Sequence, residues 1–509
     1  MAESLRKSTL KVILILAVAK LFGFLRQSAL SYFYGAGFLS DIFITTSNIP
    51  DQLINLVTGA LTFVFIPQYT KIRNNKDLES ADRFTSQVLR LVAIISLIII
   101  VVIQLFPGLI IRIFAAGFSD EQLAVSVSFL RVMSISTLAM TVATLFNGYL
   151  QAHRQFLPGS AITIVSNIII IAALFLGFKT GRPEWILPFG YLIAKFAELV
   201  YIYFHSKKIG FRLLPGTSLR DDPELRRVLL LMVPVFIGSS TQQLNLLVNR
   251  SIASTFREGS VTLITNAALI KNLFEGIIVI AIANVTFPEF SQRSHDHDLK
   301  GLRRGMAQAL SMINISMIPV SVGLMLFAEP VVKLVFERGE FTAADSRATA
   351  LVLIGYAFGL AAFGMQNVYS RVFYSFHDTK TPMYVALLGV GINIALNFIL
   401  SGFWGLKGLA WATSFSGIVG MILFFFALRR KIGGCFDRTT IIEMIKIVIV
   451  SVIGAGAARL FFDYSGQTFA LFPGLMISFI IAAVIFTACA YLLKIDSLTS
   501  LIHEARAKR

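Results

Sequence analysis

Two cations lie within the first long apolar stretch of this chain. Lys20 and Arg26 stand in the segment AKLFGFLRQSALSYFYGAG, residues 19–37, which contains no acidic residue. A charged side chain at the centre of a bilayer costs about 3 kcal/mol even on insertion-based scales. Guanidinium and ammonium groups bind phosphates and carboxylates through charge-assisted hydrogen bonds. Cations without a protein partner therefore predict a ligand that supplies the missing negative charge.

Polar residues at helical spacing follow in the second, seventh and eighth apolar stretches. In the second stretch they are spaced by three or four residues and comprise Asp41, Thr45, Asn48, Gln52, Asn55, Gly59 and Thr62. The later stretches contain Asn249 and Arg250, and then Lys271 and Glu275. Such side chains cannot face lipid without a partner, so they must face protein or a watery cavity. Pro50 lacks a backbone donor and should bend or break the second helix.

We interpret these polar stripes as the wall of a substrate site. The predicted substrate-binding residues are Lys20, Arg26, Asp41, Asn48, Gln52, Asn55, Arg250 and Lys271. Acidic partners for the cations are few, namely Asp41, Asp51 and Glu275. The alternative for single Ser, Thr and Asn side chains is a structural role in hydrogen bonds between helices. Lys195 and Glu198 are three residues apart and are expected to pair with each other.

The elements that must position these residues are membrane-spanning helices. Of 509 residues, 56% are hydrophobic and only 14% are charged, whereas soluble proteins carry about 25% charged residues. Long apolar runs recur along the whole chain, so we predict an all-α polytopic membrane protein with about fourteen transmembrane helices. The expected spans are 8–34, 40–70, 84–113, 121–151, 156–178, 184–206, 224–256, 261–290, 304–336, 346–376, 381–402, 406–429, 440–462 and 468–493.

The basic residues indicate how the chain lies in the membrane. Lys and Arg gather in every second loop and at both ends of the chain. By the positive-inside rule, both termini are expected in the cytoplasm, which predicts a multi-pass protein of the bacterial cytoplasmic membrane. The formal net charge of +17 then reflects topology and contact with anionic lipids rather than nucleic-acid binding.

An internal repeat is visible in short matching segments. Arg26 lies nine residues before Gly35 in RQSALSYFYG, and Arg250 lies nine residues before Gly259 in RSIASTFREG. The two pairs are offset by 224 residues. A common offset between separate pairs is the sign of a doubled chain. It predicts two halves built from the same arrangement of helices.

A second match extends the repeat and defines the lobes. His153 and His377 each lie five residues before a proline, again with an offset of 224 residues, and their repeated place suggests turn packing. We therefore predict two pseudo-symmetric six-helix lobes, 1–222 and 223–435, followed by two further helices and a cytoplasmic tail in 436–509. Transporters with two such lobes place their substrate between the lobes near the bilayer midplane and work by rocking.

The motifs of common enzymes are absent from the sequence. It contains no P-loop, no G-x-S-x-G, no H-E-x-x-H and no cluster of Cys and His. We therefore expect no enzymatic activity, no cofactor and no bound metal. Because a nucleotide site is also missing, transport must be driven by an ion gradient, the membrane potential or the gradient of the substrate itself.

An ordered series of segments resembles a known family. The segments KLFGFLRQSALSYFYGAGFLSDIF, FVFIPQY, LVFERGEFTAADSRATALVLIGYAFGLAAFG and SRVFYSFHDTKTPMYVALLGVGINIALN resemble the MurJ (MviN) family of lipid II flippases. These belong to the multidrug/oligosaccharidyl-lipid/polysaccharide exporter superfamily. The resemblance extends from about residue 10 to about residue 432. It implies fourteen helices, a cavity between two lobes, and export of an undecaprenyl-pyrophosphate-linked peptidoglycan precursor to the outer leaflet.

The resemblance also implies roles for single residues. Lys20 and Arg26 resemble the two basic positions of the family's first helix, and Arg250 resembles a basic residue frequent in its seventh. Asp41 resembles an acidic position at the start of the second helix. A pyrophosphate is the kind of anion that a cationic cavity lacks, and an arginine can bind it with two parallel hydrogen bonds.

Two positions depart from the family pattern. Ile54 stands where the best-studied branch has an arginine, and Leu269 stands where the eighth helix usually has a basic residue. Lys271 is two residues further on, about 200° around the helix, so it replaces that basic residue poorly. The cluster of cations is therefore smaller than in the family, which leaves another undecaprenyl-linked saccharide open as the cargo.

The driving force and the broader class of function have open alternatives. Some family members resemble sodium-coupled transporters, and the corresponding positions here are Asn249, Asn393, Asn397 and Thr413, all neutral. Because hard cations usually take some carboxylate ligands, sodium and the membrane potential both stay open as the driving force. The alternative functions are a flippase for another lipid-linked oligosaccharide, a cation-coupled exporter of small drugs, and a transport-inactive scaffold for cell-wall synthesis proteins.

Overall fold

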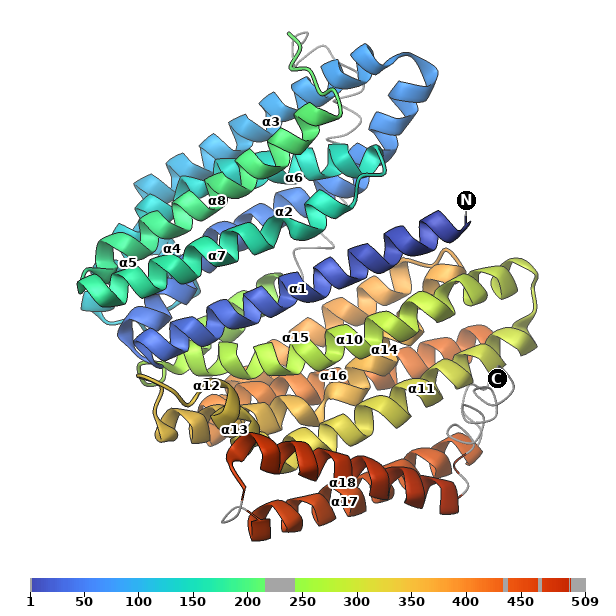
Figure 1. The fold of residues 1–509 in the computed structure, drawn as a ribbon. Coiled ribbons are helices and arrows are strands. Elements are labelled where there is room, and N and C mark those ends of the chain that lie inside the picture. Colours follow the sequence, from blue (N-terminus) through green and yellow to red (C-terminus); the bar gives the residue numbers. More distant parts are fainter. Residues whose placement is uncertain (1, 216–242, 434–437, 466–468, 494, 496–509) are drawn as a thin grey trace. The chain divides into compact units, whose positions relative to one another are not determined.

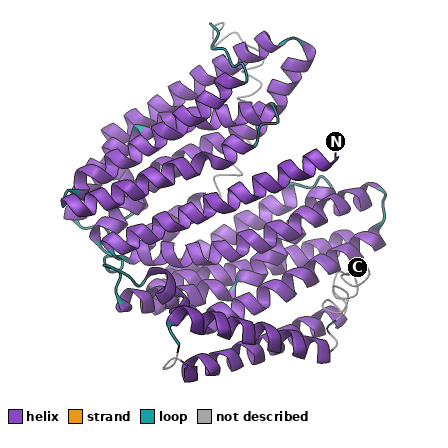
Figure 2. Cartoon of the chain, viewed as in Figure 1, coloured by secondary structure: helices purple, strands orange, loops and turns teal. Residues whose placement is uncertain are grey.

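The computed structural model describes residues 2–215, 243–433, 438–465, 469–493 and 495, and the regular elements in these ranges are all helices (Figure 1, Figure 2). In chain order they are α1 (Ala2–Tyr34), α2 (Phe38–Asn75), α3 (Leu78–Leu105), α4 (Pro107–Phe114), α5 (Asp120–Ser134), α6 (Ser136–Ala152), α7 (Leu157–Thr180), α8 (Pro183–Lys208), the helical segment 243–253, α10 (Ser260–His295), α11 (Leu299–Leu326), α12 (Ala328–Phe336), α13 (Ala343–Phe358), α14 (Leu360–Ser375), α15 (Lys380–Trp404), α16 (Leu406–Ile432), α17 (Arg438–Ser465) and α18 (Leu471–Leu492). The predicted all-α class is confirmed.

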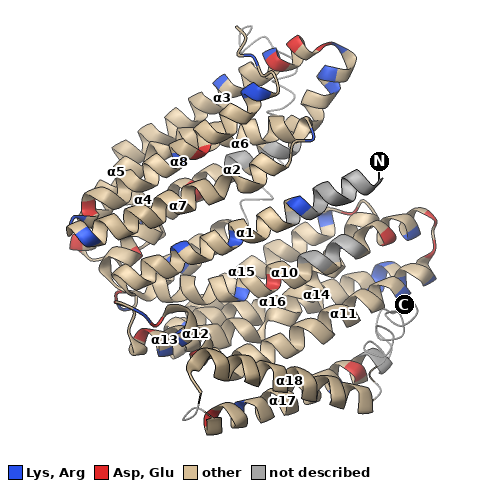
Figure 3. Ribbon diagram, viewed as in Figure 1, with Lys and Arg blue, Asp and Glu red and all other residues tan. Residues whose placement is uncertain are grey.

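Within the described residues, 12 helical stretches are long and apolar enough to cross a membrane. They correspond to twelve of the predicted spans. Of the other two predicted spans, 40–70 is covered by α2. The span 224–256 is described only at its end, where segment 243–253 is helical, because its part 224–242 lies outside the described residues. Figure 3 shows the charged residues mainly at helix ends and in loops, with largely uncharged helix middles. The chain is therefore a multi-pass membrane protein.

The structure refines two sequence expectations about single helices. The α2 helix continues through Pro50 and Pro67, so Pro50 does not break it. A proline removes only one backbone hydrogen bond, and the buried residues on either side, Ile49 and Ile54, hold the helix in place. Four predicted spans, 84–113, 121–151, 304–336 and 346–376, are each divided by a single non-helical residue. The dividing residues are Phe106, Ile135, Phe327 and Gly359, and because they are apolar or small they leave no mark on a hydropathy profile.

The helix boundaries reproduce the internal repeat. The helices α3 to α8 begin at 78, 107, 120, 136, 157 and 183, and α11 to α16 begin at 299, 328, 343, 360, 380 and 406. Corresponding starts are thus 221 to 224 residues apart. The chemistry of the helix starts repeats as well, since a capping box of Ser119 and Gln122 begins α5 and one of Thr342 and Asp345 begins α13.

The turns support the repeat with one adjustment. Gly35 and Gly259, which the sequence pairs, both have left-handed backbones, with φ of 61° and 87°. The sequence also pairs His153 with His377. In the structure the residue with positive φ that corresponds to His377 is Arg154, one position after His153. In both of these turns, the amide of the next residue donates to the carbonyl five residues earlier, as in a Schellman motif. The loop between this turn and the following proline is therefore one residue longer in the second half.

The chain divides into two compact units, described separately here. Unit 1 comprises Met1–Thr262 with Arg338–Phe341, and unit 2 comprises Leu263–Glu337 with Thr342–Arg509. In unit 1, α1 packs along α7, α7 along α8, and α2 against α5 and α6. In unit 2, α15 packs along α16, and α13 and α14 pack against α16. The two units are defined by which helices pack together, whereas the predicted lobes are defined by the internal repeat. The lobes therefore stay a prediction.

The last two helices are attached to unit 2 by apolar contacts. The helices α17 and α18 pack along each other, and α17 packs against α11. Ile318 of α11 is buried in a cluster with Ile447 and Val450 of α17. Burial of this kind stabilises by roughly 25 cal/mol for each Å² of apolar surface in water, but lipid replaces the same contacts, so close packing must hold the helices together here.

A cluster of aromatic residues closes one end of unit 1. Tyr69 of α2 and the ring of His153 are joined by a hydrogen bond of 3.3 Å, and His153 Nδ1 lies 3.0 Å from the carbonyl of Tyr149. The Tyr149 hydroxyl donates to Asp82 of α3 over 3.1 Å. Asp82 in turn accepts from the backbone amide of Arg212, which follows α8. Buried polar groups are satisfied in this way, and the cluster ties the chain after α8 to α3.

Candidate substrate site

The α1 helix presents its polar residues from a fixed position in unit 1. Its Gly23 faces α7, where a Cβ on this residue would lie 3.8 Å from Asn167. At the end of α1 the Tyr34 hydroxyl donates to the carbonyl of Leu174 over 3.0 Å. Along this helix Lys20 is exposed and Arg26 is half-buried. Packing against α7 therefore holds the two predicted cations at set positions.

Asp41 is almost completely enclosed and is used by the backbone. Only 2% of its surface is exposed. One carboxylate oxygen accepts from the amide of Gly259 over 2.8 Å, and the other accepts from the amide and the hydroxyl of Thr262 over 2.8 and 2.6 Å. Asp41 thereby caps the start of α10, where a negative charge is favoured by the helix dipole. Its oxygens are not directed at Lys20 or Arg26.

A second acidic side chain, Asp51, belongs to an ion-pair group with α8. Lys195 lies 3.4 Å from Glu198, which confirms the pair that the spacing predicts, and 3.9 Å from Asp51. The Tyr191 hydroxyl donates to Asp51 over 3.0 Å. Spacing in the sequence connects only Lys195 and Glu198. Tyr191, Lys195 and Glu198 nevertheless share one face of α8 at helical spacing, and that is the signal that could have found the group.

The third acidic candidate lies in unit 2 and is paired with a predicted cation. Lys271 and Glu275 of α10 form an ion pair of 2.8 Å, one helical turn apart. The ammonium of Lys271 also lies 5.2 Å from the ring centre of Phe363 and 6.0 Å from that of Tyr356. Lys271 is therefore compensated by its own helix and by two aromatic rings.

Each of the three acidic residues that the sequence offers as partners for the cations is thus bound to other groups. Asp41 binds backbone groups, Asp51 binds Tyr191 and lies beside Lys195, and Glu275 pairs with Lys271. Within the part of the chain that the structure describes, no ion pair forms at Lys20 or Arg26. These two cations are left to attract an anion from outside the protein.

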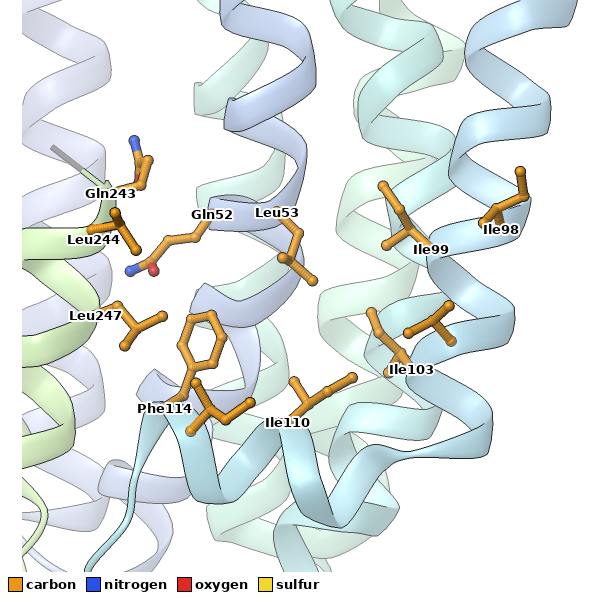
Figure 4. Close-up of a pocket in the computed structure, with 12 residues that line it drawn as sticks. Gln52, Leu53, Ile98, Ile99, Ile103, Ile110, Phe114, Gln243, Leu244 and Leu247 are labelled. Carbon is orange, nitrogen blue, oxygen red and sulfur yellow. The ribbon is translucent and has the colours of Figure 1, made fainter. Parts of the chain in front are cut away.

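The polar ladder of α2 divides into side chains with different surroundings. Asn48 donates to the carbonyl of Ile44 in its own helix, and Asn55 is exposed. Gln52 is buried, and its amide nitrogen has no hydrogen-bond partner among the described residues. Its side chain lines a cavity of about 460 Å³ between α2, α3, α4 and segment 243–253 (Figure 4). Apart from Gln52 and Gln243, this cavity is lined by apolar residues, among them Leu53, Ile98, Ile103, Phe114 and Leu247.

Arg250 lies in unit 1 at the repeat position of Arg26. It is half-buried in segment 243–253 and interacts with neighbouring groups. The chain after it turns through Gly259, whose Cβ, if present, would lie only 2.1 Å from the carbonyl oxygen of Ala36. By the bounds of the two units, seven of the eight predicted substrate residues belong to unit 1, and Lys271 belongs to unit 2.

Three of the four residues of the predicted ion site lie together in unit 2. The amide of Asn393 is 3.3 Å from the Ser416 hydroxyl and 3.5 Å from the Thr413 hydroxyl, and Asn397 donates to Asn393 over 3.0 Å. These contacts join α15 to α16. Asn249, the fourth residue, is in unit 1, where it donates to Asn245. The three residues form a neutral hydrogen-bonded group between two helices.

The fold and the site define a class of membrane transporter: a helical protein of two repeated halves whose first helix has two cations with no ion pair among the described residues. A structure described as an inward-facing multidrug resistance MATE family transporter of the MOP superfamily has the same fold, with a TM-score of 0.68 and 15% identity over 83% of this chain and 98% of that one. A structure of lipid II flippase MurJ in an inward closed conformation matches with a TM-score of 0.82 and 25% identity, covering 95% of this chain and 99% of that one.

The sequence comparisons identify the family. The family model described as lipid II flippase MurJ matches residues 30–480, so the chain belongs to the MurJ family. A probable lipid II flippase MurJ of Thermotoga maritima is 28% identical over 503 residues, which are 98% of each chain. One from Rhizobium meliloti is 26% identical over 454 residues, covering 88% of this chain and 84% of that protein. The resemblance seen in the sequence is thereby confirmed.

Proposed function

We propose that this chain moves lipid II, an undecaprenyl-pyrophosphate-linked precursor of peptidoglycan, from the cytoplasmic to the outer leaflet of the bacterial inner membrane by alternating access. Membership of the MurJ family supports this function. The structural observation that carries it is that no ion pair forms at Lys20 or Arg26 among the described residues, while Asp41 and Asp51 of the same unit are bound to other groups. A pyrophosphate supplies the negative charge that such cations attract.

The residues have separate roles in this proposal. Arg26 grips the pyrophosphate through its planar fork, and Lys20 and Arg250 add positive charge. Asn48 and Asn55 of the α2 ladder contact the sugars. Transport makes and breaks no covalent bond, so the chain has no catalytic step. Proteins of cell-wall synthesis that make or use lipid II are its expected functional partners.

The driving force follows from the charge of the cargo. Lipid II carries negative charge outwards, and a membrane potential that is negative inside favours this movement by about 2.3 kcal/mol per charge for each 100 mV. The neutral group of Asn393, Asn397 and Thr413 offers no carboxylate to a sodium ion. We therefore assign the driving force to the membrane potential. The excess of basic residues in every second loop supports a cytoplasmic position for both termini.

The test is an accessibility assay for lipid II in whole cells. A bacterial strain depleted of its own flippase is complemented with this chain, and an external enzyme that cleaves outward-facing lipid II reports translocation. We expect cleavage to be restored to the level of the native flippase. Normal expression with no rise in cleavage would overturn the proposal.

One observation favours a second cargo. Ile54 is 2% exposed in the middle of α2, where the best-studied branch of the family has an arginine, so one cation of the usual cluster is replaced by a packed apolar side chain. A different undecaprenyl-linked saccharide is therefore the second candidate. If the cells accumulate another undecaprenyl-linked oligosaccharide on depletion and lipid II exposure stays normal, this candidate replaces the first.

A further inference from the structure

Three ionisable side chains meet in the membrane-embedded part of unit 1. Asp51 comes from the middle of α2, and Lys195 and Glu198 come from the middle of α8. Lys195 is within 4 Å of both carboxylates, at 3.9 Å from Asp51 and 3.4 Å from Glu198. One ammonium cannot neutralise two carboxylates. The group therefore carries one uncompensated negative charge unless a proton or another cation joins it.

Glu198 shows where the excess charge is least well satisfied. Its side chain is only 8% exposed. One of its oxygens pairs with Lys195, and the other, Oε1, is buried and has no hydrogen-bond partner within the described part of the chain. A buried carboxylate oxygen without a donor has lost its hydrogen bonds to water and gains none from the protein in exchange. Protonation of this carboxyl group makes it neutral, and a neutral acid is buried at lower cost than a carboxylate.

Tyr191 provides hydrogen bonds for both protonation states of Asp51. Its hydroxyl lies 3.0 Å from Asp51 Oδ1 and 3.1 Å from the carbonyl oxygen of Ser47. When Asp51 is ionised, the single hydroxyl proton is donated to the carboxylate. When Asp51 is protonated, the acid donates to the tyrosine oxygen, and the tyrosine donates to Ser47 instead. Neither state leaves a hydroxyl proton without an acceptor, so the geometry allows the proton to come and go.

A fourth charge connects this group to the predicted substrate site. Arg26 lies on α1, which packs along α7, and α7 packs along α8, so this cation and the group belong to the same unit. The remaining ionisable residues of the helices that pack on α8 lie at helix ends or are bonded elsewhere, and among the described residues they include Asp120, Glu121, Arg131, Tyr149 and Lys179. Arg26 pairs with neither carboxylate within the described residues and acts on them only through its long-range field.

We infer that Asp51 and Glu198 form a proton-binding site around Lys195, which takes up one proton when a phosphate-bearing anion occupies Arg26. This inference rests on the proposed function, because the anion is the pyrophosphate of the cargo. Before binding, the field of Arg26 helps to stabilise both ionised carboxylates. After binding, the anion neutralises Arg26, and the excess negative charge at Lys195 is compensated by the proton.

The ligand of this site is a proton rather than a metal cation. Asp51 has a side chain that is 36% exposed, so water can deliver a proton to it, whereas Lys195 and Glu198 are at least 87% buried. A sodium ion would need several oxygen ligands at close range. Here the ammonium of Lys195 occupies the space between the two carboxylates and would repel it.

The test measures proton uptake on binding. The purified full-length protein in lipid nanodiscs, in a weakly buffered solution with a pH indicator, is mixed with lipid II. The pyrophosphate of this probe is a diester with no proton that titrates near neutral pH. We expect uptake of about one proton per bound lipid. By linkage, the affinity should rise by up to about tenfold for each unit by which the pH falls.

The variants separate the site from its surroundings. Asp51→Asn should bind lipid II without proton uptake and with an affinity that no longer depends on pH. Glu184→Gln, which changes an exposed carboxylate in the first turn of the same helix, should keep the full uptake. If Asp51→Asn does not fold, Tyr191→Phe replaces it. That variant keeps all charges and should shift the pH range of uptake, and an unchanged range would contradict the role of the hydroxyl.

The outcomes are distinguishable from failure of the proposed function. Binding of lipid II without any proton uptake by the unchanged protein overturns this inference and leaves the flippase function standing. Absence of binding counts against the proposed function itself. Replacing sodium by choline in the buffer should change nothing. Binding that requires sodium, without a change in pH, would assign the site to that ion and overturn the proton site.

Discussion

Asp41 accepts hydrogen bonds from both the backbone amide and the hydroxyl of Thr262, although the two residues are 221 positions apart in the chain. This carboxylate takes the place of a helix cap that the sequence before α10 does not provide. The family resemblance implies a functional acidic position here, and the structure shows a carboxylate that fixes where α10 begins. Its contribution to function passes through the position of that helix.

We expect Asp41→Asn to destabilise the protein by about 1–3 kcal/mol, because an amide offers only one accepting oxygen to three buried donors. Thermal unfolding of the purified protein in detergent measures this loss. Thr262→Val removes one of the same hydrogen bonds, so the double variant should lose less than the sum of the two single variants. Asp463→Asn, in an exposed pair with Arg459, is the matched control and should stay within about 0.5 kcal/mol of the parent.

Arg26→Ala should abolish complementation of a flippase-depleted strain at an unchanged protein level. The loss of a charge-assisted pair with phosphate is worth about 1.5–3 kcal/mol, which is roughly a 10- to 100-fold weaker affinity for lipid II. Arg26→Lys keeps the charge without the planar fork, so it shows which property matters. Full growth of the alanine variant would contradict the substrate role, and Arg182→Ala, an exposed residue before α8, serves as the control.

Exchanging the charges of Lys271 and Glu275 separates a structural pair from a substrate contact. If the ion pair is what matters, the double variant Lys271→Glu with Glu275→Lys keeps the pair and should retain transport. It loses only the contact of the ammonium with Phe363 and Tyr356, worth about 0.5–1 kcal/mol. The single variant Lys271→Ala leaves a half-buried carboxylate alone and should transport less. If the double variant is expressed normally but does not transport, Lys271 is assigned to substrate binding instead.

Gly259→Ala should be costly, because this residue combines a positive φ with a close approach to Ala36. A left-handed backbone costs an alanine about 1–2 kcal/mol, and the clash with the carbonyl adds to this. The melting temperature in detergent reports the loss. Gly389→Ala in α15 is the control, since nothing lies within 4 Å of its Cβ position, and there the substitution should be neutral or slightly stabilising.

Stability should fall at mildly acidic pH because of His153, which lies between α6 and α7 outside the membrane-spanning segments. Burial lowers the pKa of His153, so the folded protein binds a proton there less readily than the unfolded chain. The stabilising contribution is therefore complete above about pH 6.5, the ordinary value for histidine, and is lost as the pH falls below it. Melting temperatures at pH 7.5 and 5.5 measure the effect. In His153→Gln the difference should shrink.

Hydropathy and spacing were enough to predict the helices, the repeat and the local pair of Lys195 with Glu198. These features depend on residues close together in sequence, whose periodicity or spacing is visible in a single chain. The interruptions at Phe106 and Phe327 were missed for the opposite reason. A phenylalanine between two helices has the same hydropathy as one within a helix, so composition carries no sign of the break.

The contacts of the site residues could not be predicted in the same way. Asp41 finds its partners 218 and 221 residues away, and Asp51 finds Tyr191 140 residues away. Each partner is a common residue type whose neighbours in space follow only from helix packing. The lack of an ion pair at Lys20 and Arg26 in the described part of the chain was predictable in outline, because it needed only the scarcity of acidic residues nearby in the sequence.

Because α17 packs on the second half of the repeat, corresponding positions in the two halves have different neighbours. Ile318 of α11 is 7% exposed beneath α17, whereas Leu97, at the matching point of α3 in the first half, is 51% exposed and is left to the lipid. Two positions that correspond in the repeat are thus surrounded by lipid in one half and by protein in the other. Truncating Ile318 opens a void between helices, while acyl chains simply close around a shortened Leu97. Natural variation should therefore be broad at residue 97 and narrow at residue 318.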